Sequence, residues 1–252
     1  MRILISNDDG IEAEGLHALV DVLAKDHEVM ICAPMREQSG MAHALNVRRE
    51  LEVVRRKDLE EHYGLVEAWA IDGTPTDCVK IYLEAIAGVN SVDLVISGIN
   101  HGANLATDVL YSGTVGAAME GRLHDISAIA VSLDMESVLS YDYAAEITAE
   151  YVESKLMHRK DVFFQNINFP RRLRRGRPEF IFTRLGKRDY INAFSQHTDE
   201  DGRIYFTVAG EIYDTDCSEA TDIYAVNSGY IAITPLHTEL TDFMAMDDQL
   251  AR

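Results

Sequence analysis

Short apolar runs along the chain alternate with segments in which apolar residues recur at helical spacing. Residues 2–6 (RILIS) have the pattern of a buried strand, and 16–23 repeat apolar side chains at the i, i+3, i+4, i+7 positions of a helix. A second strand pattern follows at 28–33 (EVMICA). Strand, helix and strand within about 30 residues predict a βαβ unit and therefore a parallel sheet.

The alternation continues through most of the chain. Thr74, Pro75 and Asp77 have the pattern of a helix N-cap, a first helical proline and a capping acid. Further strands are expected at 65–71, 93–97, 126–132, 162–168 and 230–234, and further helices behind Thr74, over 113–123 and over 142–157. Residues 186–221 are polar and hairpin-like, with a turn around 199–202 and a strand at 204–208. An amphipathic helix is expected over 237–250.

Composition restricts the partners and the compartment. The chain has 23 Lys and Arg against 42 Asp and Glu, a net charge of −19, which argues against nucleic-acid backbones and anionic membranes. An anionic substrate would require a local reversal of this field. Three separated cysteines without a CxxC pair indicate free thiols. No apolar run suits a signal peptide or a membrane span, so we expect a soluble cytoplasmic protein.

Two adjacent carboxylates, Asp8 and Asp9, follow the first strand directly. Ligands of open α/β sheets bind outside the carboxyl ends of strands, and adjacent carboxylates there repel each other unless a cation or protons lie between them. Hard oxygen ligands favour Mg²⁺, Mn²⁺ or Ca²⁺. The alternative is that one of the two aspartates only caps the next helix.

Other polar segments are expected at the same edge of the sheet. Asn100, in SGIN, offers an amide oxygen to a hard metal, or it merely supplies turn geometry. Ser112, Gly113 and Thr114 open a helix and present the geometry of a phosphate site, or of a plain N-cap. The long loop 34–47 around Ser39 and Gly40 is a further candidate.

Several common sites are missing from the sequence. No GxGxxG follows the first strand, no GxxxxGK[ST] occurs, and no Asp-x-Asp follows a strand. The nine histidines show no HExxH or HxH metal spacing. His43 and His101 lie in candidate site loops and are kept as acid/base or substrate-binding candidates.

Taken together, the motifs resemble those of the SurE family, the stationary-phase survival proteins that act as metal-dependent 5′/3′-nucleotidases. They occur in the family's order and cover nearly the whole chain: SNDDG at 6–10, the Ser39-Gly40 loop, IDGTPTDCV at 71–79, SGIN at 97–100 with Asn104 behind it, YSGTVGAAMEGR at 111–122, NINFP at 166–170 and GYIAITPL at 229–236. The resemblance implies a Rossmann-like, mostly parallel sheet with helices on both faces, a protruding β-hairpin and an exchanged C-terminal arm. It implies one domain, with its core over about 1–185 and 222–236, the hairpin over about 186–221 and the arm over 237–252.

The resemblance also implies a site. Asp8 and Asp9 match the family's metal carboxylates and catalytic acids, Ser39 its hydroxyl ligand, and Asn100 its amide ligand, for one Mg²⁺ or Mn²⁺ per subunit. Four residues match the phosphate-binding positions: Asn104, Ser112, Gly113 and Thr114. His101 is an acid/base candidate.

The resulting hypothesis is hydrolysis of nucleoside 5′- and 3′-monophosphates to nucleoside and phosphate. Two other activities of the same site remain open, a broader phosphomonoesterase and a short-chain exopolyphosphatase, together with a non-catalytic nucleotide-binding module. Exposed aromatics at Tyr205 and Phe206 and the terminal helix indicate self-association, and the resemblance implies a homodimer or homotetramer.

Overall fold

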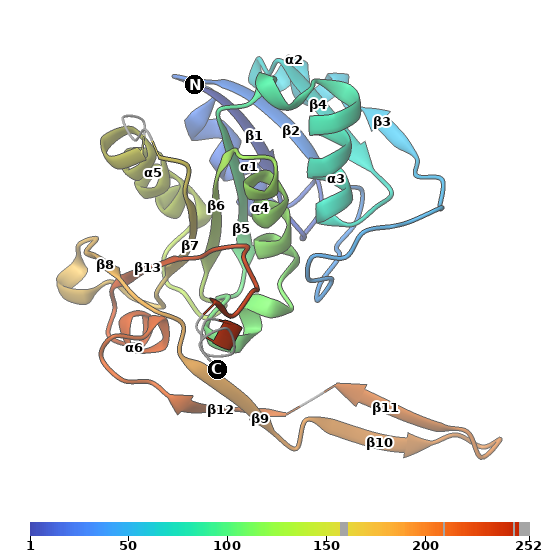
Figure 1. The fold of residues 1–252 in the computed structure, drawn as a ribbon, viewed down its shortest axis with the longest axis vertical. Helices are drawn as coiled ribbons and strands as arrows, with labels where there is room; N and C mark the ends of the chain where they lie inside the picture. The colour runs from blue at the N-terminus through green and yellow to red at the C-terminus, as the bar shows by residue number, and fades with distance from the viewer. Residues whose placement is uncertain (157–160, 209, 244, 247–252) are drawn as a thin grey trace.

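A mostly parallel sheet forms the body of the protein (Figure 1). The computed structural model describes residues 1–156, 161–208, 210–243, 245 and 246. In this part of the chain the sheet has nine strands in the order β3-β4-β2-β1-β5-β6-β7-β13-β8. Its six central strands are mutually parallel. They are β4 (Glu67–Ile71), β2 (Glu28–Pro34), β1 (Arg2–Ser6), β5 (Leu94–His101), β6 (Ser127–Leu133) and β7 (Phe164–Phe169).

Antiparallel pairing closes the two ends of the sheet. β3 (Val53–Arg55) runs antiparallel to β4. At the other end β13 (Ile231–Pro235) runs antiparallel to β7, and β8 (Phe180–Phe182) lies parallel to β13.

Helices cover both faces of the sheet (Figure 1). α1 (Glu14–Leu23) and α5 (Tyr141–Tyr151) share one apolar core with Ile3 and Ile5 of β1, whereas α3 (Pro75–Ile81) and α4 (Gly113–Leu123) share another with Leu4. Alternate residues of one strand therefore face opposite helical layers, as a doubly wound sheet requires. The shorter helical segments are α2 (Lys57–Tyr63), η1 (Tyr82–Ile86), η2 (Val89–Ser91), η3 (Ala106–Leu110), η4 (Val152–Leu156), η5 (Arg174–Gly176) and α6 (Asp222–Asn227).

Two narrow ribbons project from the body (Figure 1). β9 (Lys187–Ile191) pairs with β12 (Glu211–Asp216), and β10 (Phe194–Thr198) pairs with β11 (Ile204–Val208). Phe194, Tyr205 and Phe206 are exposed on the outer ribbon. The predicted protruding hairpin is confirmed within its expected bounds of about 186–221, and it consists of two antiparallel pairs, of which β9 and β12 lie next to the body.

The structure confirms the predicted α/β fold, and each central strand lies within a few residues of its expected position. Thr74 caps α3 in a reciprocal box with Asp77, as the sequence indicated. The helix expected over 237–250 is wrong over 237–242, which are not helical. The side chain of Asp242 accepts the Ala245 N–H at 2.9 Å, so a helix can begin only after Asp242. Residues 244 and 247–250 of that prediction lie outside the described residues.

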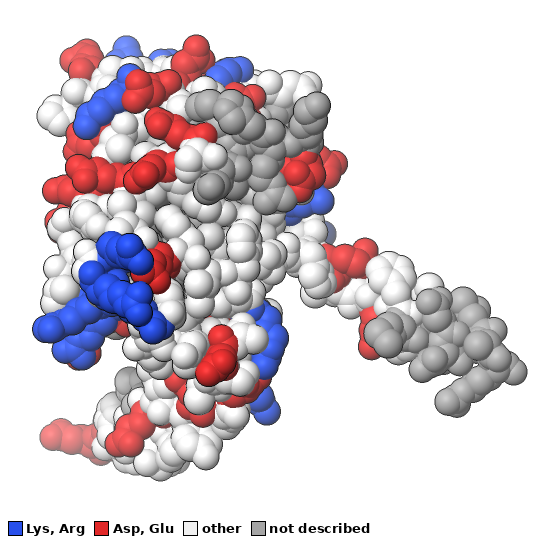
Figure 2. Space-filling model, turned by 90° about the vertical axis from the view of Figure 1, so that its left-hand side faces the viewer, with Lys and Arg blue, Asp and Glu red and all other residues white. Residues whose placement is uncertain are grey.

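The surface has the acidity that the composition predicts. On the face shown in Figure 2, Asp and Glu are spread widely, and one compact patch of Lys and Arg stands out. Within the described ranges, no helix has the length and apolar character needed to cross a bilayer.

Candidate functional site

A cavity opens where the strand order reverses. From β1 the chain winds outward through β2 and β4, and it then returns to β5 on the other side of β1. The carboxyl ends of β1 and β5 thus flank the crevice in which open α/β sheets bind ligands. A cavity of about 890 Å³ lies there. Seven of the predicted site residues line it: Asp8, Asp9, Ser39, Asn100, His101, Asn104 and Ser112.

Asp8 and Asp9 are held at this edge in an environment that disfavours their charge. Asp8 is only 6% exposed, and the Thr114 hydroxyl donates to its Oδ1 at 2.5 Å. Burial, reinforced by the charge of Asp9 and opposed by the Thr114 hydrogen bond, raises the pKa of Asp8 to about 6. Burial also raises the pKa of Asp9, whose Oδ2 accepts the His101 backbone N–H at 3.1 Å. A cation between the two carboxylates would relieve this cost.

The neighbouring donors suit a hard cation. The amide nitrogen of Asn100 donates to the Gly102 carbonyl at 2.7 Å, so the amide oxygen is the atom that Asn100 can offer to a ligand. The Ser39 hydroxyl donates to Glu37 at 2.6 Å, and its oxygen lone pairs can still coordinate. Two carboxylates, an amide oxygen and a hydroxyl form an all-oxygen set of the kind that Mg²⁺ and Mn²⁺ prefer. The residues present therefore fit the expected metal.

The predicted phosphate residues occupy two different environments. Ser112 lines the cavity, and its Oγ accepts the Val115 N–H at 3.1 Å as the cap of α4. Thr114 is fully buried, and its hydroxyl donates a hydrogen bond to Asp8. A Cβ at Gly113 would lie 2.9 Å from the Asp8 side chain, so the absence of a side chain allows the start of α4 to approach this carboxylate. Phosphate binding by these residues stays a prediction.

Asn104 is fixed by two other asparagines. Asn168 Oδ1 accepts the Asn104 N–H at 2.8 Å, and Asn166 Nδ2 donates to its carbonyl at 2.8 Å. The Asn104 side chain donates to Ser132 at 2.8 Å. The NINFP segment thus holds the loop that follows β5 rather than lining the cavity itself.

The two candidate histidines lie in different places, one at the cavity and one outside it. His101 lines the cavity, and its Nδ1 lies 2.9 Å from the Tyr141 hydroxyl. His43 is not among the lining residues. Its Nε2 lies 2.7 Å from Glu120 Oε2, on the far side of the Ser39 loop. His43 is therefore placed to support that loop rather than to act on a substrate.

Several contacts clamp the Ser39 loop onto the helical layer. Asn46 donates its backbone N–H and its side-chain amide to Asp77, at 3.0 and 2.6 Å. The Ala42 N–H donates to the Tyr111 carbonyl at 2.9 Å. A Cβ at Gly116 would lie 2.1 Å from the Ala42 carbonyl oxygen, so only glycine permits this approach of loop and helix.

A second group of ligand-type atoms lies outside the cavity. Ligand atoms of Glu84, Glu120 and His124 lie within 4.8 Å of one another. The Lys80 ammonium already lies 2.7 Å from Glu84 and 3.0 Å from Glu120. The Lys80 ammonium thus already offsets part of the negative charge of this group, and the oxygen set around Asp8 remains the better metal candidate.

Part of the cavity wall was not predicted from the sequence. Asp108 comes from η3, and Tyr111 and Met135 come from the turns that follow η3 and β6, whereas Tyr190, Phe194 and Val208 come from the ribbons. In the sequence, the exposed aromatics of the hairpin indicate self-association, and the structure shows that residues of both ribbons also line the cavity.

Comparison with known proteins agrees with these observations. A family model described as "Survival protein SurE" matches residues 3–192. A protein of Pelotomaculum thermopropionicum named 5′-nucleotidase SurE is 47% identical over 251 residues, which cover 98% of this chain and 93% of that protein. A protein of the same name from Heliobacterium modesticaldum is 42% identical over 98% of this chain and 90% of its own length. The crystal structure of the SurE protein from Aquifex aeolicus superposes with a TM-score of 0.82 at 34% identity, covering 100% of both chains.

The contacts of Glu120 with His43 and Lys80 should make the free energy of unfolding depend on pH. Burial acts to raise the pKa of Glu120, but the hydrogen bonds with His43 and Lys80 outweigh it and lower the pKa to about 2. A lowered pKa stabilises the fold fully above the ordinary value near 4.5, and this contribution is lost as pH falls toward 2. Glu120→Gln should therefore lower the free energy of unfolding at pH 7 by about 1–3 kcal/mol.

Urea denaturation of wild type and Glu120→Gln across pH 7 to pH 2 measures this effect. The difference between the two proteins should shrink as pH falls and should vanish near pH 2. Glu150→Gln, an exposed position of α5, is the matched control and should show little change. A Glu120→Gln difference that is independent of pH would contradict the assignment.

Proposed function

Because the chain belongs to the SurE family, we propose that it is a metal-dependent 5′-nucleotidase that also accepts 3′-monophosphates, releasing nucleoside and phosphate. One observation carries the proposal. Residues from four separate segments, the ends of β1 and β5, the Ser39 loop and the start of α4, line a single cavity at the switch point of the sheet. The names of the 37–47% identical relatives support nucleotidase activity.

Metal dependence is supported by the charge of the cavity. Four acids line it, namely Asp8, Asp9, Glu37 and Asp108, and no Lys or Arg does so among the described residues. A nucleotide phosphate brings further negative charge, so a cation has to compensate. Asp8, Asp9, Ser39 and Asn100 would hold one Mg²⁺ or Mn²⁺. When bound, such an ion neutralises phosphoryl oxygens and makes a bound water more acidic.

The chain's own residues supply the remaining steps. The N-terminus of α4, with Ser112, Gly113 and Thr114, directs backbone N–H groups toward the phosphoryl oxygens and stabilises the charge that develops there. Asn104, in the loop after β5, also contributes to binding the phosphoryl group. Asp9 orients the attacking water and accepts its proton, while the water oxygen bonds to phosphorus and the ester P–O bond breaks. His101 is the candidate that returns a proton to the leaving oxygen.

We further propose a homodimer or homotetramer in the cytoplasm. Ile204, Tyr205 and Phe206 are exposed on a two-stranded ribbon, and such ribbons are marginal in water without a partner surface. An exchanged C-terminal arm would add a second contact between subunits. The free thiols of Cys32, Cys78 and Cys217 support a reducing compartment.

The first test is phosphate release by Asp8→Asn and Asp9→Asn. Each substitution removes a carboxylate that would hold the cation, so kcat should fall at least about 100-fold. Asp21→Asn, on the exposed side of α1, is the control and should keep wild-type activity. Nucleoside monophosphates, an aryl phosphate and polyphosphate should be assayed with Mg²⁺, Mn²⁺ or chelator. Wild-type activity of either site variant together with insensitivity to chelator would refute the metal assignment, and binding without turnover would indicate a binding module.

A second test separates phosphate binding from helix capping at Ser112 and Thr114. Ser112→Ala should lose the cap on Val115, which typically costs about 0.5–2 kcal/mol of stability, and should also weaken competitive inhibition by inorganic phosphate. Thr114→Ala removes the hydroxyl that donates a hydrogen bond to Asp8, so the apparent affinity for the metal should fall as well. Unchanged phosphate inhibition in both variants would leave these residues a structural role alone.

A third test concerns assembly. Light scattering of the full-length chain should give at least a dimer, and deletion of 237–252 should give a smaller or aggregating species, because an exchanged arm is part of the partner's core. A monodisperse full-length monomer would contradict the proposal. A truncated form of unchanged mass and melting temperature would contradict the role of the arm.

A further inference from the structure

The cavity has two chemically different ends. The sheet edge contributes the oxygen donors around Asp8, whereas the ribbons contribute the apolar side chains of Tyr190, Phe194 and Val208. Its volume of about 890 Å³ is in the range of sites for whole small molecules, and a phosphate group alone would fill only a small part of it. The remaining space therefore suits the rest of the substrate.

The ribbon side chains are suited to a flat ring. Phe194 is 65% exposed although it lines the cavity, and Tyr190 is also exposed. Large aromatic surfaces left in water are costly, and aromatic faces stack on nucleobases with little dependence on the base. We propose that Tyr190 and Phe194 form the nucleobase subsite and that Arg188 is a positioning residue that holds this aromatic wall over the cavity. The inference rests on the proposed nucleotidase function and specifies how its substrate is held.

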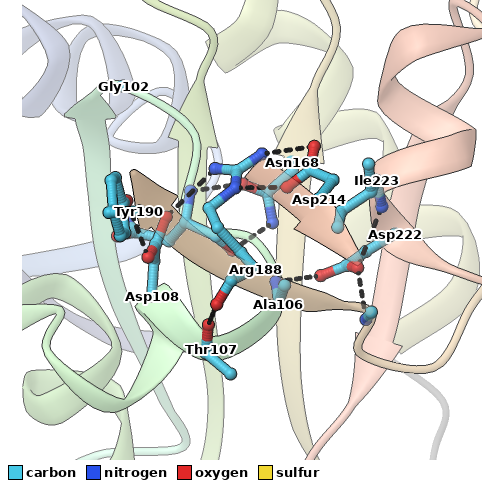
Figure 3. A network of polar contacts seen from close by, with 12 residues as sticks. Gly102, Ala106, Thr107, Asp108, Asn168, Arg188, Tyr190, Asp214, Asp222 and Ile223 are labelled. Carbon is cyan, nitrogen blue, oxygen red and sulfur yellow. Dashed lines mark hydrogen bonds and ion pairs between the residues drawn. The ribbon is translucent and has the colours of Figure 1, made fainter. Parts of the chain in front are cut away.

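Arg188 connects the inner ribbon to the body (Figure 3). Its Nη1 donates to Asp108 at 3.0 Å, and its Nε and Nη2 donate to the two oxygens of Asp214 at 2.8 and 3.3 Å. The side chain is only 10% exposed, so the guanidinium is withdrawn from water between two carboxylates. Moving the ribbon away would leave these charges buried without a partner, which is strongly unfavourable, so the contacts oppose displacement of the ribbon.

Further contacts join the same two parts of the chain (Figure 3). The Tyr190 hydroxyl donates to Asp108 at 2.9 Å, and the Thr107 hydroxyl donates to the Arg188 carbonyl at 2.6 Å. Asp222 accepts the Ala106 N–H at 2.7 Å and the Gly186 N–H at 2.8 Å, so one carboxylate holds the start of η3 and the segment that leads into β9.

This network fixes the position of Tyr190 and Phe194 relative to the oxygen donors around Asp8. η3 follows directly from Asn104, which Asn166 and Asn168 hold against β7. Hydrogen bonds hold Asn104 on the sheet, the chain leads from Asn104 through η3 to Asp108, and Asp108 binds both Arg188 and Tyr190. An isolated two-stranded ribbon would not hold an aromatic wall in place without this network.

The test compares adenosine 5′-monophosphate with ribose 5-phosphate, the same ester without the base. Wild type should show a KM for the nucleotide that is lower by about 5- to 100-fold, the usual effect of one base–aromatic stack. Phe194→Ala should raise the KM for the nucleotide at least about 5-fold, while the KM for ribose 5-phosphate changes less than about 2-fold. Tyr213→Ala is the control: Tyr213 lies on the adjoining ribbon, is 54% exposed and does not line the cavity, and its replacement should change neither value.

Arg188→Gln tests the positioning role through the split between KM and kcat. It should raise the KM for the nucleotide as Phe194→Ala does, with kcat for ribose 5-phosphate largely retained, and Arg188→Lys should restore part of the loss. In the Phe194→Ala background, Arg188→Gln should add little, because both changes act on one wall. Arg203→Gln, an exposed arginine near the ribbon tip, is the control.

The outcomes distinguish the inference from the function on which it rests. If wild type releases phosphate from neither ester, the proposed function fails. If wild type hydrolyses both esters with equal KM, or if Phe194→Ala leaves the KM for the nucleotide unchanged, the base subsite alone is refuted. If Phe194→Ala changes the mass in light scattering but not the KM, the wall is a contact between copies of the chain, and the base subsite is again refuted.

Discussion

The adjacent carboxylates of Asp8 and Asp9 impose the main constraint on this structure. They lie at the end of β1, where the strand order reverses, and burial raises the pKa of both. Folding thus places two carboxyl groups where burial disfavours the charged form of each unless a positive charge lies nearby. The Thr114 hydroxyl and the N-terminal end of α4 offset part of this cost, whereas the oxygens of Asn100 and Ser39 would do so only by holding a cation together with the two carboxylates.

Ser39 differs from the other predicted ligands because it belongs to a long loop rather than to the end of a strand. Its position depends on contacts made several residues away, through Ala42, His43 and Asn46. The contacts of His43 and Asn46 end on α4 and α3, the helices that also cover this face of the sheet, and the Ala42 N–H bonds to Tyr111 just before α4. The buried charge of Glu120 therefore serves the site indirectly, by holding the loop while contacting nothing in the cavity.

The sequence predicted the parts of the fold that depend on local pattern. Apolar runs identified the six parallel strands, and Thr74 with Asp77 identified a helix start, because these signals lie within a few residues of each other. β3 and β8 have three residues each and carry too little periodicity to be recognised. The candidate site was largely predictable because the ends of parallel strands meet at one edge. The hydrogen bonds of Thr114 with Asp8 and of Arg188 with Asp108 were not predictable, since the two residues of each pair are 106 and 80 positions apart in the sequence.

The Arg188 network also has an electrostatic consequence. Asp108 lines a cavity that already contains three other acids, and a free carboxylate there would repel an anionic substrate. Arg188 and the Tyr190 hydroxyl both bind this carboxylate, so part of its charge is offset, although Arg188 is shared with Asp214. Asp108 can then join the ribbon to the body with less repulsion of the substrate than a free carboxylate would cause. The same ion pair that orients the apolar end of the cavity thereby leaves the metal end as the place where its negative charge is concentrated.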